Sequence, residues 1–217
     1  RVRVNMDEKQ IDRRTFLLRG GRAAGFAAVA LAGGVLLNEH ERHPFHAAED
    51  RPIVRDLRVR GIERKLVVVR GDDPARMTSA ALDAFGGIAA FVAAGDFVVV
   101  KPNIGWDRKP EQAANTNPEV VAEVVRQCLR AGAARVLVTD ISCNESHRCF
   151  NRSGIAAAAH EAGADVQLPE EARFREVNIG GLVLGRQPVY DAYLEADKFI
   201  SIPIAKHHGL TRATLGM

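Results

Sequence analysis

Cysteine is scarce in this 217-residue sequence: Cys128, Cys143 and Cys149 are the only three, and no two form a Cys-x-x-Cys pair. This excludes a disulfide-rich scaffold, a paired-cysteine zinc framework and an iron–sulfur motif within the chain. Gly-x-Gly-x-x-Gly, Walker, His-Glu-x-x-His and Gly-x-Ser-x-Gly motifs are also missing. The sequence therefore leaves the cofactor unknown and indicates no standard nucleotide, zinc-protease or hydrolase site.

A large excess of one charge is also missing, because 30 Lys and Arg residues stand against 27 Asp and Glu residues, a formal net charge of +3. Aromatic residues make up 6% of the chain, and they do not alternate with a basic stripe. We therefore expect no nucleic-acid partner. Only six of the basic residues are lysines, so the position of each lysine is informative.

Long hydrophobic runs are missing as well. The longest uncharged stretch begins at residue 23, and its apolar part ends at residue 37 after 15 residues, whereas a membrane-spanning helix needs roughly 20. A short run of Ala and Gly suits a signal peptide. The residues before it resemble the bacterial twin-arginine (Tat) export motif: Arg13, Arg14, Phe16 and Leu17.

We predict that residues 1–48 are a twin-arginine signal segment and linker, with the twin-arginine translocase as partner. The protein is then periplasmic or otherwise exported, and it stays membrane-attached if the signal is not cleaved. The alternative is a buried helix with two exposed arginines at its start. In the linker, His40, His43 and His46 could hold a metal ion, but Pro44 breaks their helical spacing, so we predict no metal site there.

Residues 49–217 alternate short β-branched runs with longer amphipathic ones, which predicts an α/β domain with a mostly parallel sheet and helices on both faces. The expected strands are residues 66–69, 97–100, 136–139, 166–168 and 199–202. The expected helices are residues 75–84, 118–131 and 153–162.

Three glycines support the parallel order. Gly95, Gly132 and Gly163 each precede an expected strand, where glycine can take the left-handed conformation that ends a helix. Their spacing of 37 and 31 residues fits one strand, one crossover helix and a return.

Residues 172–190 alternate differently and contain Gly180-Gly181, which predicts an inserted antiparallel hairpin with residues 182–184 in its second strand. The last segment, residues 211–217, starts a new amphipathic or turn element without a cap. We therefore expect the domain to be truncated at its C-terminus.

Polar residues follow three of the expected strands, at the edge where parallel sheets place their functional groups. Lys101 and Lys206 follow two strands in equivalent places and could bind one anion together, aided by the free amides of a helix that starts at Pro118. Asp140, Ser142 and His208 could supply acid–base groups. The alternative is that both lysines are solvated loop residues, that Asp140 caps a turn and that Asn103 holds the loop backbone.

The residues in these loops resemble the family named domain of unknown function 362. The resemblance rests on the segments 95–104, 116–119, 131–140, 153–155 and 203–208, and it spans about residues 64–217. It implies an α/β domain and a set of functional positions: Lys101, Asn103, Thr116, Asn117, Asp140, Lys206 and His208. Ligand binding is then expected of Lys101, Asn103, Thr116, Asn117 and Lys206, and catalysis of Asp140 and His208.

Two classes of function remain open. One is an exported, redox-linked enzyme that acts on an anionic small molecule in a lysine-lined cleft. The other is a noncatalytic periplasmic protein that binds a ligand or assists a redox partner. Outside the inner membrane, Cys143 and Cys149 could also form a disulfide, the alternative being two free thiols.

Overall fold

The computed structural model describes residues 14, 57, 59, 61 and 65–214. The chain divides into two units, Arg1–Asp50 and Arg51–Met217, and the description below concerns the second. Apart from Arg14, which is helical and exposed, the expected export signal and the three linker histidines lie outside the described residues. In the part of the chain that is described, no helix is long and apolar enough to cross a membrane.

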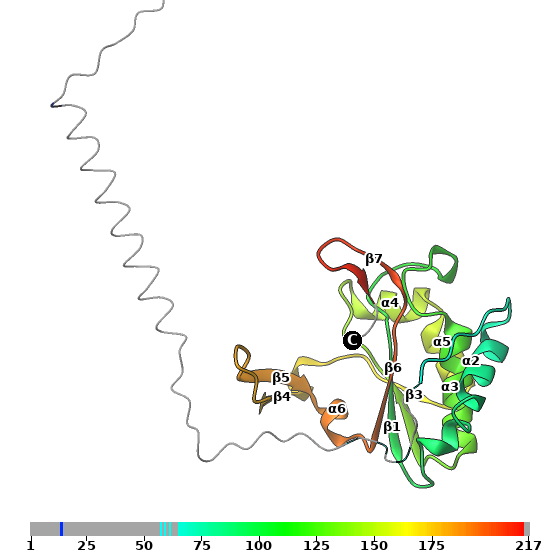
Figure 1. Ribbon diagram of the computed structural model, residues 1–217. Helices are drawn as coiled ribbons and strands as arrows, with labels where there is room; N and C mark the ends of the chain where they lie inside the picture. The colour runs from blue at the N-terminus through cyan, green and yellow to red at the C-terminus, as the bar shows by residue number, and fades with distance from the viewer. Residues whose placement is uncertain (1–13, 15–56, 58, 60, 62–64, 215–217) are drawn as a thin grey trace, which may run out of the picture. The chain divides into compact units, whose positions relative to one another are not determined.

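A four-stranded parallel sheet in the order β3-β2-β1-β6 forms the centre of the domain (Figure 1). Its strands are β1 (Phe97–Pro102), β2 (Arg135–Val138), β3 (Asp165–Val166) and β6 (Lys198–Ile202). Val98, Val99 and Val100 of β1 are fully buried, as expected for a parallel sheet covered on both faces. The predicted α/β class is confirmed.

Most helices cover one face of this sheet, as Figure 1 shows. They are α2 (Pro74–Asp83), α3 (Pro118–Arg130) and α5 (Ile155–Glu161), while α4 (Ser146–Arg152) follows β2. Three short 3₁₀ turns lie at Ile88–Ala90 (η1), Pro110–Gln112 (η2) and Glu171–Arg173 (η3). The larger core lies between this helical layer and the sheet.

The other face carries α6 (Asp191–Glu195) and a smaller core, in which Val99 and Leu137 of the sheet pack against Tyr190, Ala192 and Ala196. A hairpin of β4 (Phe174–Asn178) and β5 (Arg186–Tyr190) leads into α6. The inserted antiparallel hairpin is therefore confirmed. A second hairpin, β7 (Lys206–His208) and β8 (Arg212–Thr214), follows β6.

Helix α3 begins where the sequence predicts. The side chain of Asn117 accepts a hydrogen bond from the backbone N–H of Glu119, and Pro118 occupies the first turn. Val121, Val125 and Cys128 are fully buried on one side of the helix. These residues fix α3 against β1 and so place the loop before it at the carboxyl edge of the sheet.

Four details of the expected secondary structure are wrong. Residues 66–69 pair with no strand among the described residues, and Leu66 is 88% exposed. The reason is that β-branched residues form a strand only where a partner strand is present.

The expected helix at 153–162 begins only at Ile155, because Gly154 adopts a positive φ of 73° between α4 and α5. Gly95 lies in a turn and does not end a helix, although Gly132 and Gly163 do follow the ends of α3 and α5. The second hairpin strand is β5, since residues 182–184 form an exposed loop.

Candidate functional site

The order of the strands creates a switch point between β1 and β6. From β1 the chain moves outward through β2 to β3, and it then returns to β6 on the opposite side of β1. The crossover connections therefore leave the sheet on different faces at this point, which opens a crevice beyond the carboxyl ends of the two strands. Lys101 lies at the end of β1, and Lys206 begins β7 shortly after β6.

Lys101 forms an ion pair with Asp140, with 2.6 Å between Nζ and Oδ1. The other carboxylate oxygen of Asp140 accepts a hydrogen bond of 2.7 Å from the backbone N–H of Ile104. Asp140 is 3% exposed, so both of its oxygens are satisfied inside the protein. This carboxylate holds the Lys101 ammonium group and the loop after β1 in place, and two N–H groups of Lys101 remain for other partners.

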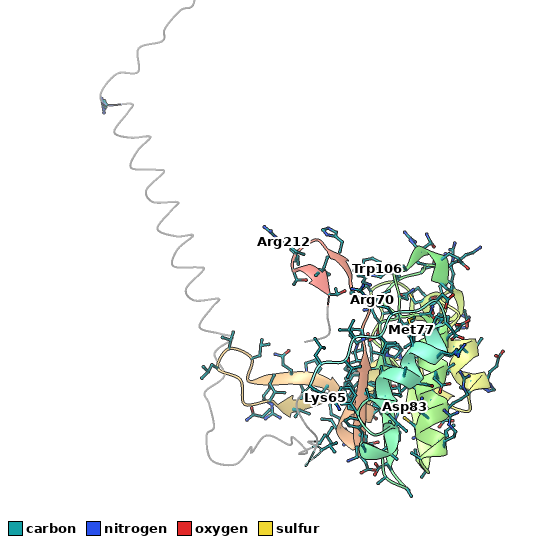
Figure 2. All side chains as sticks on the ribbon, turned by 45° about the vertical axis from the view of Figure 1, so that its right-hand side comes forward. Lys65, Arg70, Met77, Asp83, Trp106 and Arg212 are labelled. Carbon is teal, nitrogen blue, oxygen red and sulfur yellow. The ribbon has the colours of Figure 1, made fainter. Side chains whose placement is uncertain are left out.

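Lys206 contacts the loop that follows β1. Its ammonium group donates hydrogen bonds to the side-chain oxygen of Asn103, at 2.7 Å, and to the carbonyl of Ala114. It also lies 5.8 Å from the ring centroid of Trp106. Figure 2 shows Trp106 at the same end of the domain as Arg212 of β8. Two of the three N–H groups of Lys206 are used, which leaves one for a ligand.

Thr116 ties the loop to both strands. Its hydroxyl donates to the carbonyl of Ile202, at 2.6 Å, and accepts from the backbone N–H of Asn103, at 2.8 Å. Asn115, which is 6% exposed, holds the next part of the loop through the backbone N–H and carbonyl of Trp106. Asn103 and Thr116 therefore position Lys206 and the loop.

Burial lowers the pKa of Lys206 below the usual lysine value, while nearby Cys143 and Asp140 act in the opposite direction. The ammonium group has lost part of its hydration without a full counter-charge in direct contact. With two ammonium groups and one carboxylate, the cluster has a formal charge of about +1 at neutral pH. This arrangement favours an anion in the crevice.

The structure thus brings Lys101, Asn103, Thr116, Asp140 and Lys206 together in one cluster. Asn117 is adjacent but uses its side chain to cap α3. Ser142 donates to the carbonyl of Ile104. In the described part of the chain, the hydrogen bonds of the His208 ring are to its own hairpin, where Nδ1 accepts from the N–H groups of Leu210 and Thr211.

Sequence reasoning missed Trp106, and for Cys143 and Cys149 it left open a disulfide or two free thiols. The structure shows all three cysteines as free thiols, with Cys149 fully buried in the core and Cys143 exposed at the lysine cluster. The disulfide considered for Cys143 and Cys149 is therefore not formed, and the alternative of two free thiols holds. As the single tryptophan in the sequence, Trp106 gave no repeating pattern that could have identified it.

Other positions in the domain are less suited to binding an anion than the lysine cluster. A hollow of about 480 Å³ beside β3 is lined in part by Arg135, His160 and Arg173. Both arginines are already paired with carboxylates, Arg135 with Asp165 and Arg173 with Asp191. Among the described residues, no group of three or more His, Cys, Asp or Glu side chains could hold a metal ion.

The family model described as domain of unknown function (DUF362) matches residues 98–217, which is more than half of the chain. The chain belongs to this family. The match begins in β1 and includes both lysine loops and the segment between them, so the whole candidate site lies within the DUF362 region. No curated protein and no solved structure matches the chain.

Proposed function

We propose that this DUF362 domain binds an anionic small molecule, through a carboxylate or phosphate group, in the crevice between the carboxyl ends of β1 and β6. The observation that carries the proposal is the position of the half-buried Lys206 ammonium group. It lies at the switch point of the sheet, it retains an N–H group, and Lys101 is held on the same loop by Asp140.

The contacts of the two lysines support binding better than a purely structural role. A lysine that only pins a loop needs no exposed surface, whereas the Lys101 side chain is 33% exposed. Each charge-assisted hydrogen bond to a ligand contributes on the order of 1.5–3 kcal/mol. Two such contacts together would strengthen the binding of a small anion roughly 100-fold or more.

Inorganic phosphate tests this proposal, because Trp106 is the only tryptophan and its ring lies next to Lys206. Titration with phosphate should change the fluorescence of Trp106. Lys206→Met or Lys101→Met should weaken phosphate binding roughly 10-fold or more. Lys198→Met is the matched control, since Lys198 lies in β6 but at its amino end, at the opposite edge of the sheet.

Equal phosphate affinity in the wild type, Lys101→Met and Lys206→Met proteins would contradict the proposal, as would equal losses in all three variants. The solvated-loop interpretation expects the first of these results. Circular dichroism melting of each variant separates a loss of binding from a loss of folding.

Both classes of function require this anion site. We favour an exported, redox-linked enzyme, and the alternative is a noncatalytic periplasmic ligand-binding or redox-accessory protein. The two carboxylate oxygens of Asp140 already contact the Lys101 ammonium group and the backbone N–H of Ile104. The role of Asp140 in an enzyme is therefore to orient Lys101. The Nε2 atom of His208 is the ring nitrogen outside the hairpin contacts to Nδ1, and it is the candidate for proton transfer. Consumption of a bound anion in the presence of an electron acceptor distinguishes the enzyme from the binding protein.

We also propose export through the twin-arginine translocase, based on the paired arginines before a short apolar run. Arg13→Lys with Arg14→Lys should leave the protein in the cytoplasm, because lysine lacks the planar guanidinium group. Cell fractionation measures this directly. The control is Arg19→Lys with Arg22→Lys, which changes two arginines of the same segment outside the motif, and unchanged export of the first double variant would refute the proposed route.

A further inference from the structure

The hydroxyl group of Tyr193 in α6 is buried and has no hydrogen-bond partner in the part of the chain that the structure describes. The ring itself is well packed, with edge-to-face contacts to Tyr190 and Phe199 at centroid distances of 5.7 and 5.3 Å. Native proteins give nearly all buried polar groups a partner, because leaving one unpaired is destabilising. The ring contacts explain why Phe would fit here, but they do not explain the hydroxyl.

The sheet face under α6 connects Tyr193 with the lysine cluster. Val99 pairs in register with Phe199, and the next pair on the same face toward the carboxyl edge is Lys101 with Ser201. Tyr193 packs against the first of these pairs. Burial, and after it the negative charge of Asp140, raises the pKa of Tyr193 far above the usual tyrosine value. Because Lys101 lies two residues after Val99 on β1, Tyr193 packs on the same face of the sheet that carries Lys101.

The chemistry of the two groups is complementary to one kind of ligand atom. The phenol keeps its proton at neutral pH, as any tyrosine does, and its raised pKa only holds that proton more firmly, so it can donate a hydrogen bond. Lys101 has two N–H groups beyond its contact with Asp140. Both oxygens of Asp140 already have partners. The atom that would satisfy the phenol and the ammonium group together is a negatively charged oxygen.

We propose that Tyr193 contacts the ligand of the anion site, donating its hydroxyl hydrogen bond to a carboxylate or phosphate oxygen that Lys101 also binds. This inference rests on the proposed function and deepens it, because it places the anionic oxygen on the α6 face of the sheet. Helix α6 then forms one wall of the site, in addition to covering the smaller core.

The test is Tyr193→Phe in the purified 217-residue chain, with melting temperature and phosphate affinity measured together. Removing an unpaired hydroxyl should leave the melting temperature unchanged or raise it. The same change should weaken phosphate binding roughly 5-fold to 10-fold. Tyr190→Phe is the matched control. It removes a hydroxyl from the adjacent ring, one that donates to the carbonyl of Leu168 at 3.3 Å, so it should lower the melting temperature by about 2–4 °C and leave phosphate affinity unchanged.

Unchanged phosphate affinity in Tyr193→Phe would overturn the inference, whatever the melting temperature. A loss of affinity together with a lower melting temperature would also overturn it, because the hydroxyl would then have a structural partner. If Lys206→Met loses binding while Tyr193→Phe keeps it, the proposed function stands and only this inference fails. If the wild-type protein does not bind phosphate, both the proposed function and the inference about Tyr193 are contradicted.

Discussion

Lys101 and Lys206 occupy similar positions after two strands, but their ammonium groups have different partners. Each follows a strand of the same sheet, but Lys101 is neutralised by a buried carboxylate, whereas the hydrogen bonds that Lys206 makes to described residues go to neutral acceptors, the Asn103 side chain and the Ala114 carbonyl. The second arrangement lowers the pKa of Lys206 through burial. Of the two, Lys206 therefore gains more from an arriving anion.

Glu123 of α3 is the clearest case of a charge used for stability. Burial raises its pKa, but hydrogen bonds from Gln127, Arg130, Arg126 and Ser79 outweigh this effect and lower the value from 4.5 to about 2. The folded protein therefore prefers the ionised form. This contributes at most about 3 kcal/mol at neutral pH, an amount that is fully present above pH 4.5 and lost as the pH falls toward about 2.

Glu123→Gln should therefore be less stable than the wild type at pH 7, and the difference should shrink as the pH falls from about 4.5 to about 2. Urea unfolding at several pH values measures it. Because Ser79 lies in α2 and bonds to Glu123, the loss should also loosen the contact between α2 and α3. A difference in unfolding free energy that stays constant across this pH range would contradict the assignment.

At the scale of elements, the turns into β1 and β2 depend on glycine for different reasons. Gly95 and Gly132 have φ values of 90° and 93°, so alanine is strained at either position by roughly 1–2 kcal/mol. A Cβ atom at Gly95 would meet nothing within 4 Å, whereas one at Gly132 would lie 3.1 Å from Cβ and 3.3 Å from Cα of Ala94. The two turns pack together there, since the N–H of Gly95 donates to the carbonyl of Gly132.

We predict that Gly132→Ala destabilises the domain more than Gly95→Ala, by about 1 kcal/mol or more, because only the first change forces two backbone segments apart. Chemical denaturation of both variants tests this. Equal losses would show that the left-handed backbone conformation alone matters at these turns.

The elements that sequence patterns predicted correctly are those whose apolar residues form a clear local pattern. Helix α3 has apolar residues at helical spacing after the Asn117 cap and Pro118, whereas β1 and β2 are short continuous apolar runs that the sheet buries. The failures depend on partners elsewhere in the chain. Residues 66–69 have strand-forming side chains but pair with no strand in the described part of the chain, and residues 182–184 are apolar yet exposed in a hairpin loop.

At the scale of the whole molecule, the sequence predicted which polar residues follow the strands, but it did not predict which strands are neighbours in the sheet. The sequence indicated Lys101, Asp140 and Lys206 as candidates, and only the strand order β3-β2-β1-β6 places β1 and β6 side by side. Tyr193 lies in α6, which follows the β4–β5 hairpin. This helix packs on the face of the sheet that carries the smaller core. No local pattern connects Tyr193 with Lys101, because only the register of β1 with β6 and the packing of α6 place both residues on one face of the sheet.

The most direct test of the central claim is a crystal structure of the chain with inorganic phosphate. The account predicts a phosphate at the carboxyl edge between β1 and β6, with oxygens within about 3.5 Å of the ammonium groups of both Lys101 and Lys206. Phosphate bound only elsewhere, or ammonium groups of Lys101 and Lys206 more than about 15 Å apart, would contradict it, because no small anion could then contact both lysines.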